Sequence, residues 1–396
     1  QNLASLPIIS LTNLQEMMRF KNKSLLALQK KKLEQVGQKV SMLLRKSEKN
    51  IYYITILNSP SRKKLFQKTK EYICGMNYQT LRIIFMGTPD FAVASLDALV
   101  QAGCNIVAVV TAPDKPAGRG MKLQQSAVKQ YADTNGLITL QPDKLKSPEF
   151  IEALQKLQAD IQVVVAFRML PEIVWNMPPL GTINVHGSLL PQYRGAAPIN
   201  WAIINGEKET GVTTFKLQHA IDTGDILLQE KIEIGDNETV GEIYDRLKIV
   251  GADTLVKTIK QLATGTLLPM PQNACTAIDT AELQHAPKIF TTTCYINFEQ
   301  PVEVVHNLVR GLSPFPGAFT YLNGKMFKIF ATEKEFSSLS EKPGTIVTDN
   351  KTFLKIACSN GYIHCLFIQL EGKKKMLIED FLRGTTIIAT AITQLQ

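Results

Sequence analysis

The sequence lacks the features that identify membrane-spanning, secreted and metal-binding proteins. It contains no run of eighteen apolar residues, so we expect no transmembrane helix and no membrane partner. The first apolar stretch, residues 5–14, has no basic flank before it and no small-residue cleavage site after it, so we expect no signal peptide. The 6 cysteines show no CxxC spacing, and no cysteine-histidine spacing suits zinc. We therefore expect no metal site, and reduced thiols in a reducing compartment.

Two common catalytic signatures are also missing. No GxSxG segment is present, which argues against a serine-nucleophile elbow. The segment "MGTPDF" at residues 86–91 follows an apolar strand but lacks the GxGxxG pattern, which argues against a dinucleotide site. The chemistry must therefore come from other residues.

The net positive charge of the chain comes from one end. The formal net charge is +9, yet residues 1–75 hold 15 Lys and Arg against 4 Asp and Glu, and the remainder holds 29 against 31. A polyanion could therefore contact the main body only through a local patch. We interpret residues 1–75, which include an amphipathic helical pattern, as a dispensable basic extension. The alternatives are a basic arm that binds RNA and a targeting segment.

Apolar segments alternate between strand and helix patterns from residue 81 onward. Residues 81–86, 105–111, 161–167 and 181–185 read as buried strands, and residues 90–103, 124–136, 147–159 and 239–265 as helices. This alternation predicts an α/β, Rossmann-like domain with a parallel, doubly wound sheet. Ligands of such sheets bind at the carboxyl ends of the strands.

The pattern changes to short alternating strands after a proline-containing segment. Asn323-Gly324 stands between two alternating runs, which is a strong hairpin signal. We therefore predict a small antiparallel barrel or sandwich, OB-like, at the carboxyl end. The predicted divisions are the extension at 1–75, a catalytic domain at 76–265, a linker at 266–280 and a β-barrel domain at 281–396.

Three polar residues could act together on a carbonyl group. Asn184 and His186 lie two apart in an extended segment, so their side chains share a face, and Asp222 follows in "HAIDTGDILLQ". An amide and a histidine can stabilise an oxyanion, and an aspartate can orient the histidine or collect a proton. This set suits attack on a carbonyl by an external nucleophile. The alternative is that His186 is a structural histidine at a strand end. Ser188 is a poor candidate for a nucleophile.

A basic segment follows the second predicted strand. Pro113, Pro116, Gly118 and Gly120 favour an exposed loop within residues 111–129. Lys115, Arg119 and Lys122 make it positive, which suits contact with a phosphate backbone. Lys373 and Lys374 form a second basic group. A solvated loop or turn is the alternative in both places.

Motifs along the chain resemble the methionyl-tRNA formyltransferases. They are "FMGTPDFAVASL", "PDKPAGRG", "NVHGSLLPQYRGAAPINW", "ETGVTTFKLQHAIDTGDIL", "APKI", "VRGLSPFPGAF" and "EGKKKMLIEDFL", in this order. The resemblance covers residues 81–385. It implies that the formyl group of 10-formyltetrahydrofolate is transferred to the α-amino group of methionyl initiator tRNA, for translation initiation. It also implies Asn184, His186 and Asp222 as the catalytic set.

The resemblance also implies the binding residues. For the folate they are Ser188, Leu189, Leu190, Pro191, Phe167 and Arg168, with a cis bond allowed between Leu190 and Pro191. For the tRNA they are Arg119, Lys115, Lys122, Lys373 and Lys374. Arg168 stands where the family pattern has glycine, so this chain departs from the family at a segment that borders the folate site. We expect a monomer in the bacterial cytoplasm, with an organelle as the alternative.

Two other functions fit parts of the sequence. One is a formyltransferase or formyl-folate hydrolase that acts on a small amine or on water, against which the basic loop argues. The other is a non-catalytic RNA-binding protein, which would have no use for the Asn184, His186 and Asp222 set.

Overall fold

A computed structural model describes residues 77–117, 122–274, 283–338, 341–388 and 390–392. These residues belong to one compact unit, Lys68–Gln396. The basic extension predicted at residues 1–75, with its amphipathic helix, lies outside the described residues.

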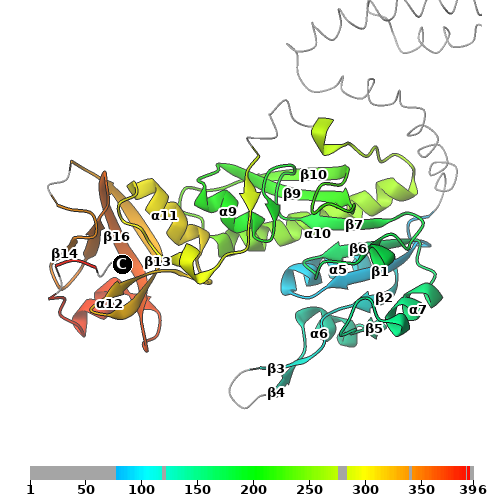
Figure 1. Ribbon diagram of the computed structural model, residues 1–396, viewed down its shortest axis with the longest axis horizontal. Coiled ribbons are helices and arrows are strands. Elements are labelled where there is room, and N and C mark those ends of the chain that lie inside the picture. The colour runs from blue at the N-terminus through cyan, green and yellow to red at the C-terminus, as the bar shows by residue number, and fades with distance from the viewer. Residues whose placement is uncertain (1–76, 118–121, 275–282, 339–340, 389, 393–396) are drawn as a thin grey trace, which may run out of the picture. The chain divides into compact units, whose positions relative to one another are not determined.

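The first sheet has seven strands in the order β10-β9-β7-β6-β1-β2-β5 (Figure 1). The five parallel strands are β1 (Arg82–Gly87), β2 (Asn105–Val110), β5 (Thr139–Leu140), β6 (Ile161–Val165) and β7 (Thr182–His186). The two antiparallel strands at one edge are β9 (Glu209–Lys216) and β10 (Ile226–Glu233). The predicted parallel sheet is confirmed, with an antiparallel edge added to it.

Apolar side chains cover both faces of this sheet. Ile83 and Phe85 of β1 pack into one core with α5 and α10, whereas Ile84 and Met86 pack into another with α7 and α8. Alternate residues of a strand point to opposite faces, so a strand buried on both sides reads as a continuous apolar run. The helices are α5 (Asp90–Gln101), α6 (Ala127–Thr134), α7 (Pro148–Lys156), α8 (Glu172–Trp175), α9 (Pro198–Ile204) and α10 (Val240–Ala263).

Side-chain caps fix the starts of two predicted helices. Ser147 accepts a hydrogen bond from the Phe150 N–H at the start of α7, where Pro148 takes the first helical position. Thr239 and Glu242 form a capping box at the start of α10. Both helices therefore begin where the sequence predicts.

The carboxyl-terminal part folds on a six-stranded antiparallel sheet with its own apolar core. Its strands are β12 (Ala318–Leu322), β13 (Lys325–Phe336), β14 (Ile346–Thr348), β15 (Leu354–Ala357), β16 (Gly361–Leu370) and β17 (Met376–Leu377). Two α-helices accompany them, α11 (Val302–Gly311) and α12 (Ile378–Arg383). The predicted hairpin is confirmed, because Asn323 and Gly324 connect β12 to β13 with φ of 52° and 74°.

The basic segment differs from the exposed loop that the sequence predicts. Its described ends form an antiparallel hairpin, β3 (Lys115–Ala117) with β4 (Lys122–Gln124), which projects beyond α6 (Figure 1). Pro116 is tolerated because each strand of a two-stranded hairpin is an edge. Arg119 lies outside the described residues.

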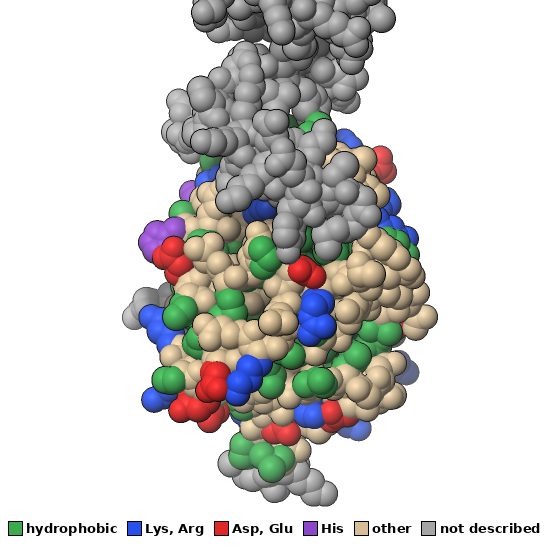
Figure 2. All heavy atoms as spheres, turned by 90° about the vertical axis from the view of Figure 1, so that its right-hand side faces the viewer, with side chains coloured by type: hydrophobic (Ala, Val, Ile, Leu, Met, Phe, Trp, Pro, Cys, Tyr) green, Lys and Arg blue, Asp and Glu red, His purple; other side chains and the backbone are tan. Residues whose placement is uncertain are grey.

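Charges of both signs are mixed on the main body. On the face drawn in Figure 2, Lys and Arg side chains are interspersed with Asp and Glu side chains. This agrees with the near balance of charges beyond residue 75. Association with a polyanion would therefore depend on local basic groups such as the β3–β4 hairpin.

Candidate active site

Asn184 and His186 lie on β7, next to one another on one face of the strand. His186 ends the strand, opposite Thr213 of β9, and Asn184 lies opposite Phe215. His186 is only 6% exposed and Asn184 is half-buried. Within the part of the chain that the structure describes, the Asn184 side chain makes no hydrogen bond. Its amide is therefore available to a ligand.

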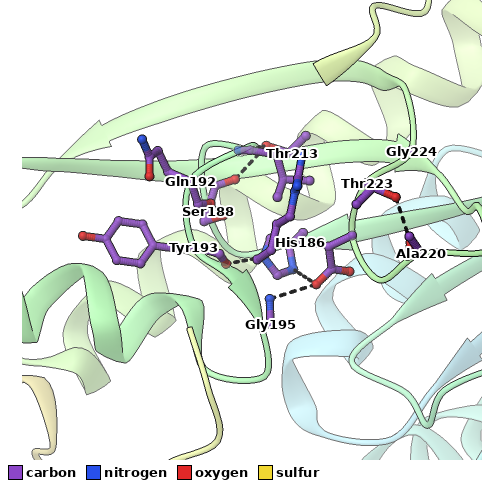
Figure 3. Close-up of polar contacts among 12 residues, drawn as sticks. His186, Ser188, Gln192, Tyr193, Gly195, Thr213, Ala220, Thr223 and Gly224 are labelled. Atoms are coloured by element: carbon purple, nitrogen blue, oxygen red, sulfur yellow. Dashed lines mark hydrogen bonds and ion pairs between the residues drawn. The ribbon is translucent and has the colours of Figure 1, made fainter. Parts of the chain in front are cut away.

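The ring of His186 is held in one orientation (Figure 3). Its Nε2 lies 2.9 Å from the backbone oxygen of Tyr193. A carbonyl oxygen only accepts, so Nε2 carries the hydrogen and donates it. Its Nδ1 faces the Oδ2 atom of Asp222 at 3.8 Å. The Nδ1 edge is consequently the edge that can exchange a proton or bind a substrate oxygen.

Asp222 lies in the turn between β9 and β10, in a backbone conformation that is uncommon for residues other than glycine. Its φ of 53° falls in the left-handed region. Its Oδ2 accepts a hydrogen bond of 3.0 Å from the Gly195 N–H. This oxygen also faces His186, so the structure brings together two residues that lie 36 positions apart in the sequence. Asn184 adjoins them from the same strand as His186.

Two glycines allow the loops around Asp222 to approach other backbone closely. A Cβ atom on Gly195, whose φ is 128°, would lie 2.4 Å from the backbone oxygen of Ala286. A Cβ atom on Gly224 would lie 1.6 Å from the backbone oxygen of Lys216. Any larger residue at either position would move the backbone that carries or contacts Asp222. The sequence alone did not assign a role to Arg194-Gly195.

Arg194 and Gly195 form β8 (Arg194–Gly195), which pairs in parallel with β11 (His285–Ala286). The Arg194 guanidinium donates two hydrogen bonds to Oε1 of Gln272, at 3.1 and 2.6 Å. Burial lowers the pKa of Arg194, and the nearby Asp222 carboxylate partly offsets this effect. Gln272 lies within the predicted linker, and its composition gave no signal of a role at the site.

The loop predicted to contact folate is fixed by a buried threonine. The Thr213 hydroxyl donates to the Ser188 backbone oxygen at 2.6 Å and accepts from the Leu190 N–H at 3.1 Å. Gln229 also donates to this hydroxyl and to the Leu190 backbone oxygen. The Leu190–Pro191 bond is cis. Thr213 was not identified from the sequence, because it lies on a different strand from the loop that it holds.

Ser188 forms its side-chain hydrogen bond within the loop that follows β7. It is fully buried, and its hydroxyl donates a 2.7 Å hydrogen bond to the Gln192 backbone oxygen. Figure 3 shows this residue beside Gln192 and Thr213. The Ser188 hydroxyl therefore stabilises the conformation of its own loop. Leu190 is buried against Phe215 and Ile226, whereas Leu189 is half-buried.

Phe167 and Arg168 follow the carboxyl end of β6. The strand stops at Val165 because Ala166 has a left-handed φ of 47°, two residues before the predicted end. The Arg168 guanidinium donates to the backbone oxygens of Pro142 and Asp143, at 2.6 and 3.0 Å. Its Cζ atom lies 5.4 Å from the centre of the Phe167 ring. Arg168 thus connects this strand end to the segment after β5.

The predicted basic residues lie on two hairpin structures. Lys115 is exposed on β3, whereas the side chain of Lys122 is not described. Lys373 and Lys374 are exposed in the turn between β16 and β17. The next residue, Lys375, instead donates to the Pro314 backbone oxygen and lies 3.7 Å from the centre of the Phe330 ring.

Two other kinds of site are absent from the described residues. Within those ranges, there is no group of three or more His, Cys, Asp and Glu side chains that could hold a metal ion. Of the helices described, none has the length and apolar character needed to cross a membrane.

Comparisons with known proteins agree with the architecture and with the motifs. Residues 81–259 match the family "Formyl transferase", and residues 288–386 match "Formyl transferase, C-terminal domain". The chain is 51% identical to a methionyl-tRNA formyltransferase of Bacteroides fragilis over 314 residues, which are 78% of this chain and 96% of that protein. It is 52% identical to that of Parabacteroides distasonis over 320 residues, 79% of this chain and 98% of that protein.

Solved structures share the fold at lower identity. The sugar 3N-formyltransferase WlaRD, solved with dTDP and 5-N-formyl-THF, is 21% identical with a TM-score of 0.54, over 74% of this chain and 99% of its own. HypX from Aquifex aeolicus, solved with tetrahydrofolic acid, is 18% identical with a TM-score of 0.51, over 76% of this chain and 47% of its own. The resemblance inferred from the motifs is confirmed by the relatives at about half identity. The chain belongs to the methionyl-tRNA formyltransferase family.

Proposed function

We propose that this protein transfers the formyl group of 10-formyltetrahydrofolate to the α-amino group of methionyl initiator tRNA. The observation that carries the proposal is the pairing of His186 Nδ1 with the Asp222 carboxylate at 3.8 Å. The pair adjoins the free Asn184 amide, in a chain about half identical to named methionyl-tRNA formyltransferases. The substrates supply both nucleophile and formyl carbon, so no covalent enzyme intermediate is required.

Asn184 and His186 stabilise the oxyanion in this mechanism. The amine attacks the formyl carbon, a C–N bond forms and the carbonyl electrons move to oxygen. Nε2 of His186 already donates its hydrogen to the Tyr193 backbone oxygen. The ring therefore donates to the formyl oxygen through a proton on Nδ1. The Asn184 amide supplies the second donor. Donors fixed before the reaction stabilise developing charge without reorganisation.

Asp222 assists the proton transfer. Its Oδ2 atom lies 3.8 Å from Nδ1 of His186, beside the nitrogen that donates to the oxyanion. As the intermediate collapses, the bond between the formyl carbon and the folate nitrogen breaks. The folate nitrogen takes up the proton that the former amine nitrogen, positively charged after its attack, gives up. Asp222 relays this proton while Gly195 N–H holds its Oδ2 in place.

The loop after β7 and the end of β6 form the folate side of the site. Ser188, Leu189, Leu190 and Pro191 supply one wall, and Phe167 with Arg168 supplies another. Support comes from the hydrogen bonds of Thr213 and Gln229, which give the loop a fixed backbone onto which a flat ring can pack. Two proteins of similar fold were solved with folates, as described above.

The β3–β4 hairpin and the β16–β17 turn contact the tRNA. Lys115, Arg119 and Lys122 serve the first contact, and Lys373 and Lys374 the second. Further support comes from a groove of about 410 Å³ whose lining includes Asn200, Lys288, Phe290, Phe315 and Lys328. Phe290 is 60% exposed and Phe315 81%. Exposed aromatic rings beside lysines are typical of surfaces that bind unpaired nucleotides.

Catalysis and tRNA binding involve two domains of one monomer. Residues 76–265 carry the chemistry and the β3–β4 hairpin, residues 266–280 link the domains, and residues 281–396 form the second tRNA-binding part. The curated relatives quoted above are bacterial, and we place the protein in the bacterial cytoplasm.

A formylation assay tests this proposal. Purified full-length protein is incubated with 10-formyltetrahydrofolate and initiator tRNA charged with methionine. We expect formylmethionyl-tRNA, with no transfer to free methionine. Release of formate without an acceptor would favour a hydrolase, transfer to a small amine would favour a small-substrate enzyme, and tRNA binding without any turnover would favour an RNA-binding protein.

A further inference from the structure

The side chain of Gln272 connects two parts of the active site that lie far apart in the sequence. It lies in a short 3₁₀ helix, η1 (Gln272–Ala274), and is 3% exposed. Its Nε2 donates to the backbone oxygens of Asp222 and Gly224, both at 2.8 Å. Its Oε1 accepts the two hydrogen bonds from Arg194. All four hydrogen-bonding positions of this amide are therefore used.

The chemistry of the partners allows only one orientation of this amide. A guanidinium only donates, so the oxygen of the amide must face Arg194. Backbone oxygens only accept, so the NH₂ group must face Asp222 and Gly224. The two interactions reinforce each other, since Arg194 turns the amide so that both N–H groups point at the Asp222 turn.

The Asp222 turn requires such support. Asp222 has a φ of 53°, and a left-handed conformation of a non-glycine residue persists only where its surroundings hold it. The two hydrogen bonds from Gln272 fix the backbone oxygens of Asp222 and Gly224, the residues on either side of Thr223. The same turn sets where the Asp222 carboxylate lies relative to Gly195 N–H and His186 Nδ1.

We propose that Gln272, oriented by Arg194, is a positioning residue for the reaction, which acts by holding the Asp222 carboxylate against His186. The inference rests on the proposed function and adds to it. Gln272 touches neither substrate in this account. It follows that the segment between the two sheets is part of the active site.

The substitution Gln272→Glu tests the role with the smallest change of shape. A glutamate still accepts from Arg194, but it loses both donors and places a carboxylate against two backbone oxygens. Displacement of a catalytic group by about 1 Å can cost about 100-fold in rate. We expect kcat for formylation to fall by about 10- to 100-fold, with KM for both substrates changed by less than about 2-fold.

A matched control distinguishes the loss of the Gln272 hydrogen bonds from the general effect of an added negative charge. Gln130→Glu on α6 introduces the same charge and removes an amide that donates to a backbone oxygen, that of Gln125, on an exposed surface. We expect its kcat to equal that of the unaltered protein. If Gln272→Glu lowers the melting temperature, Arg194→Lys provides the second test, because a single ammonium cannot reproduce the paired bonds. We expect a fall in kcat of about 3- to 10-fold.

A double-mutant cycle with Asp222→Asn decides whether Gln272 acts through Asp222. Once the carboxylate is gone its position no longer matters, so Gln272→Glu should lower the remaining single-turnover rate by less than about 2-fold. An equal fall in both backgrounds, or no fall in either, would overturn the proposal. Absence of formylation by the unaltered protein would instead overturn the proposed function, so the two failures are distinguishable.

Discussion

Among single residues, Thr213 has a structural role at the site that the motifs do not reveal. Its hydroxyl hydrogen-bonds to the buried backbone of Ser188 and Leu190 and to the half-buried side chain of Gln229. The backbone pairing of β7 with β9, which holds Asn184 and His186, does not depend on the Thr213 hydroxyl. The loop proposed to contact folate does depend on this hydroxyl, because its backbone is bonded to it at Ser188 and Leu190.

Substitution of Thr213 by valine is expected to weaken binding of the formyl donor. Valine keeps the shape but leaves two buried backbone groups, the Ser188 oxygen and the Leu190 N–H, without this partner, at a cost of about 1–3 kcal/mol in the free energy of unfolding. We expect a raised KM for 10-formyltetrahydrofolate and a smaller effect on KM for tRNA, measured by steady-state formylation. Thr254→Val in α10 is the control, because it removes a buried hydroxyl that bonds only within its helix. A valine variant at 213 with an unchanged folate KM would show that the loop does not bind folate.

At the level of elements, the β3–β4 hairpin is small and extends away from the sheet (Figure 1). Replacement of Lys115, Arg119 and Lys122 by alanine removes three positive charges. Each phosphate contact adds to the dependence of affinity on salt. We therefore expect weaker binding of methionyl-tRNA with a shallower salt dependence, measured by filter binding, and an unchanged Kd for folate. Equal losses for both ligands would favour a small acceptor substrate.

Elements with a local cause could be predicted from the sequence. Asn323-Gly324 specifies a tight hairpin wherever it stands between alternating runs, and Ser147-Pro148 starts a helix through its own cap. Asn184 and His186 were identifiable because strand geometry places residues two apart on one face. These arguments need only near neighbours.

Features that depend on distant contacts could not be predicted. Gln272 bonds to residues 48, 50 and 78 positions away, and nothing around it marks it as different from a linker residue. The pairing of β8 with β11 involves two residues on each side, too few for a periodic pattern. The end of β6 at Val165 follows from one left-handed residue, Ala166, which no sequence rule indicated.

At the level of the whole molecule, His306 of α11 joins the two sheet-based cores. Its Nε2 lies 3.2 Å from the Asp236 backbone oxygen and so donates, while its Nδ1 accepts from the Thr332 hydroxyl at 2.9 Å. The neutral ring is thus fully bonded. Burial lowers the pKa of His306, and the positive charges of Lys334 and Arg310 lower it further. The hydrogen bond to the Asp236 backbone oxygen and the negative charge of the Asp236 carboxylate oppose this shift.

This arrangement predicts a loss of stability in acid. The unfolded chain binds a proton at His306 near the ordinary pKa of about 6.5, whereas the folded chain does so only at lower pH. The unfolded state therefore holds more protons between these values, and stability falls as pH drops through about 6.5. We expect the free energy of unfolding in urea to decrease from pH 7.5 to 5.5, and by less in His306→Gln. Equal pH dependence in both proteins would contradict this role.

The most direct test of the central claim is the single-turnover rate of formyl transfer to methionyl-tRNA by the unaltered protein and by Asn184→Ala and His186→Ala. Loss of one oxyanion donor typically costs about 2.7–4 kcal/mol. We predict measurable transfer by the unaltered protein and a fall of at least about 100-fold in each variant, with the fold of each variant retained. Rates near normal in either folded variant would contradict the assignment of Asn184 and His186 to the oxyanion.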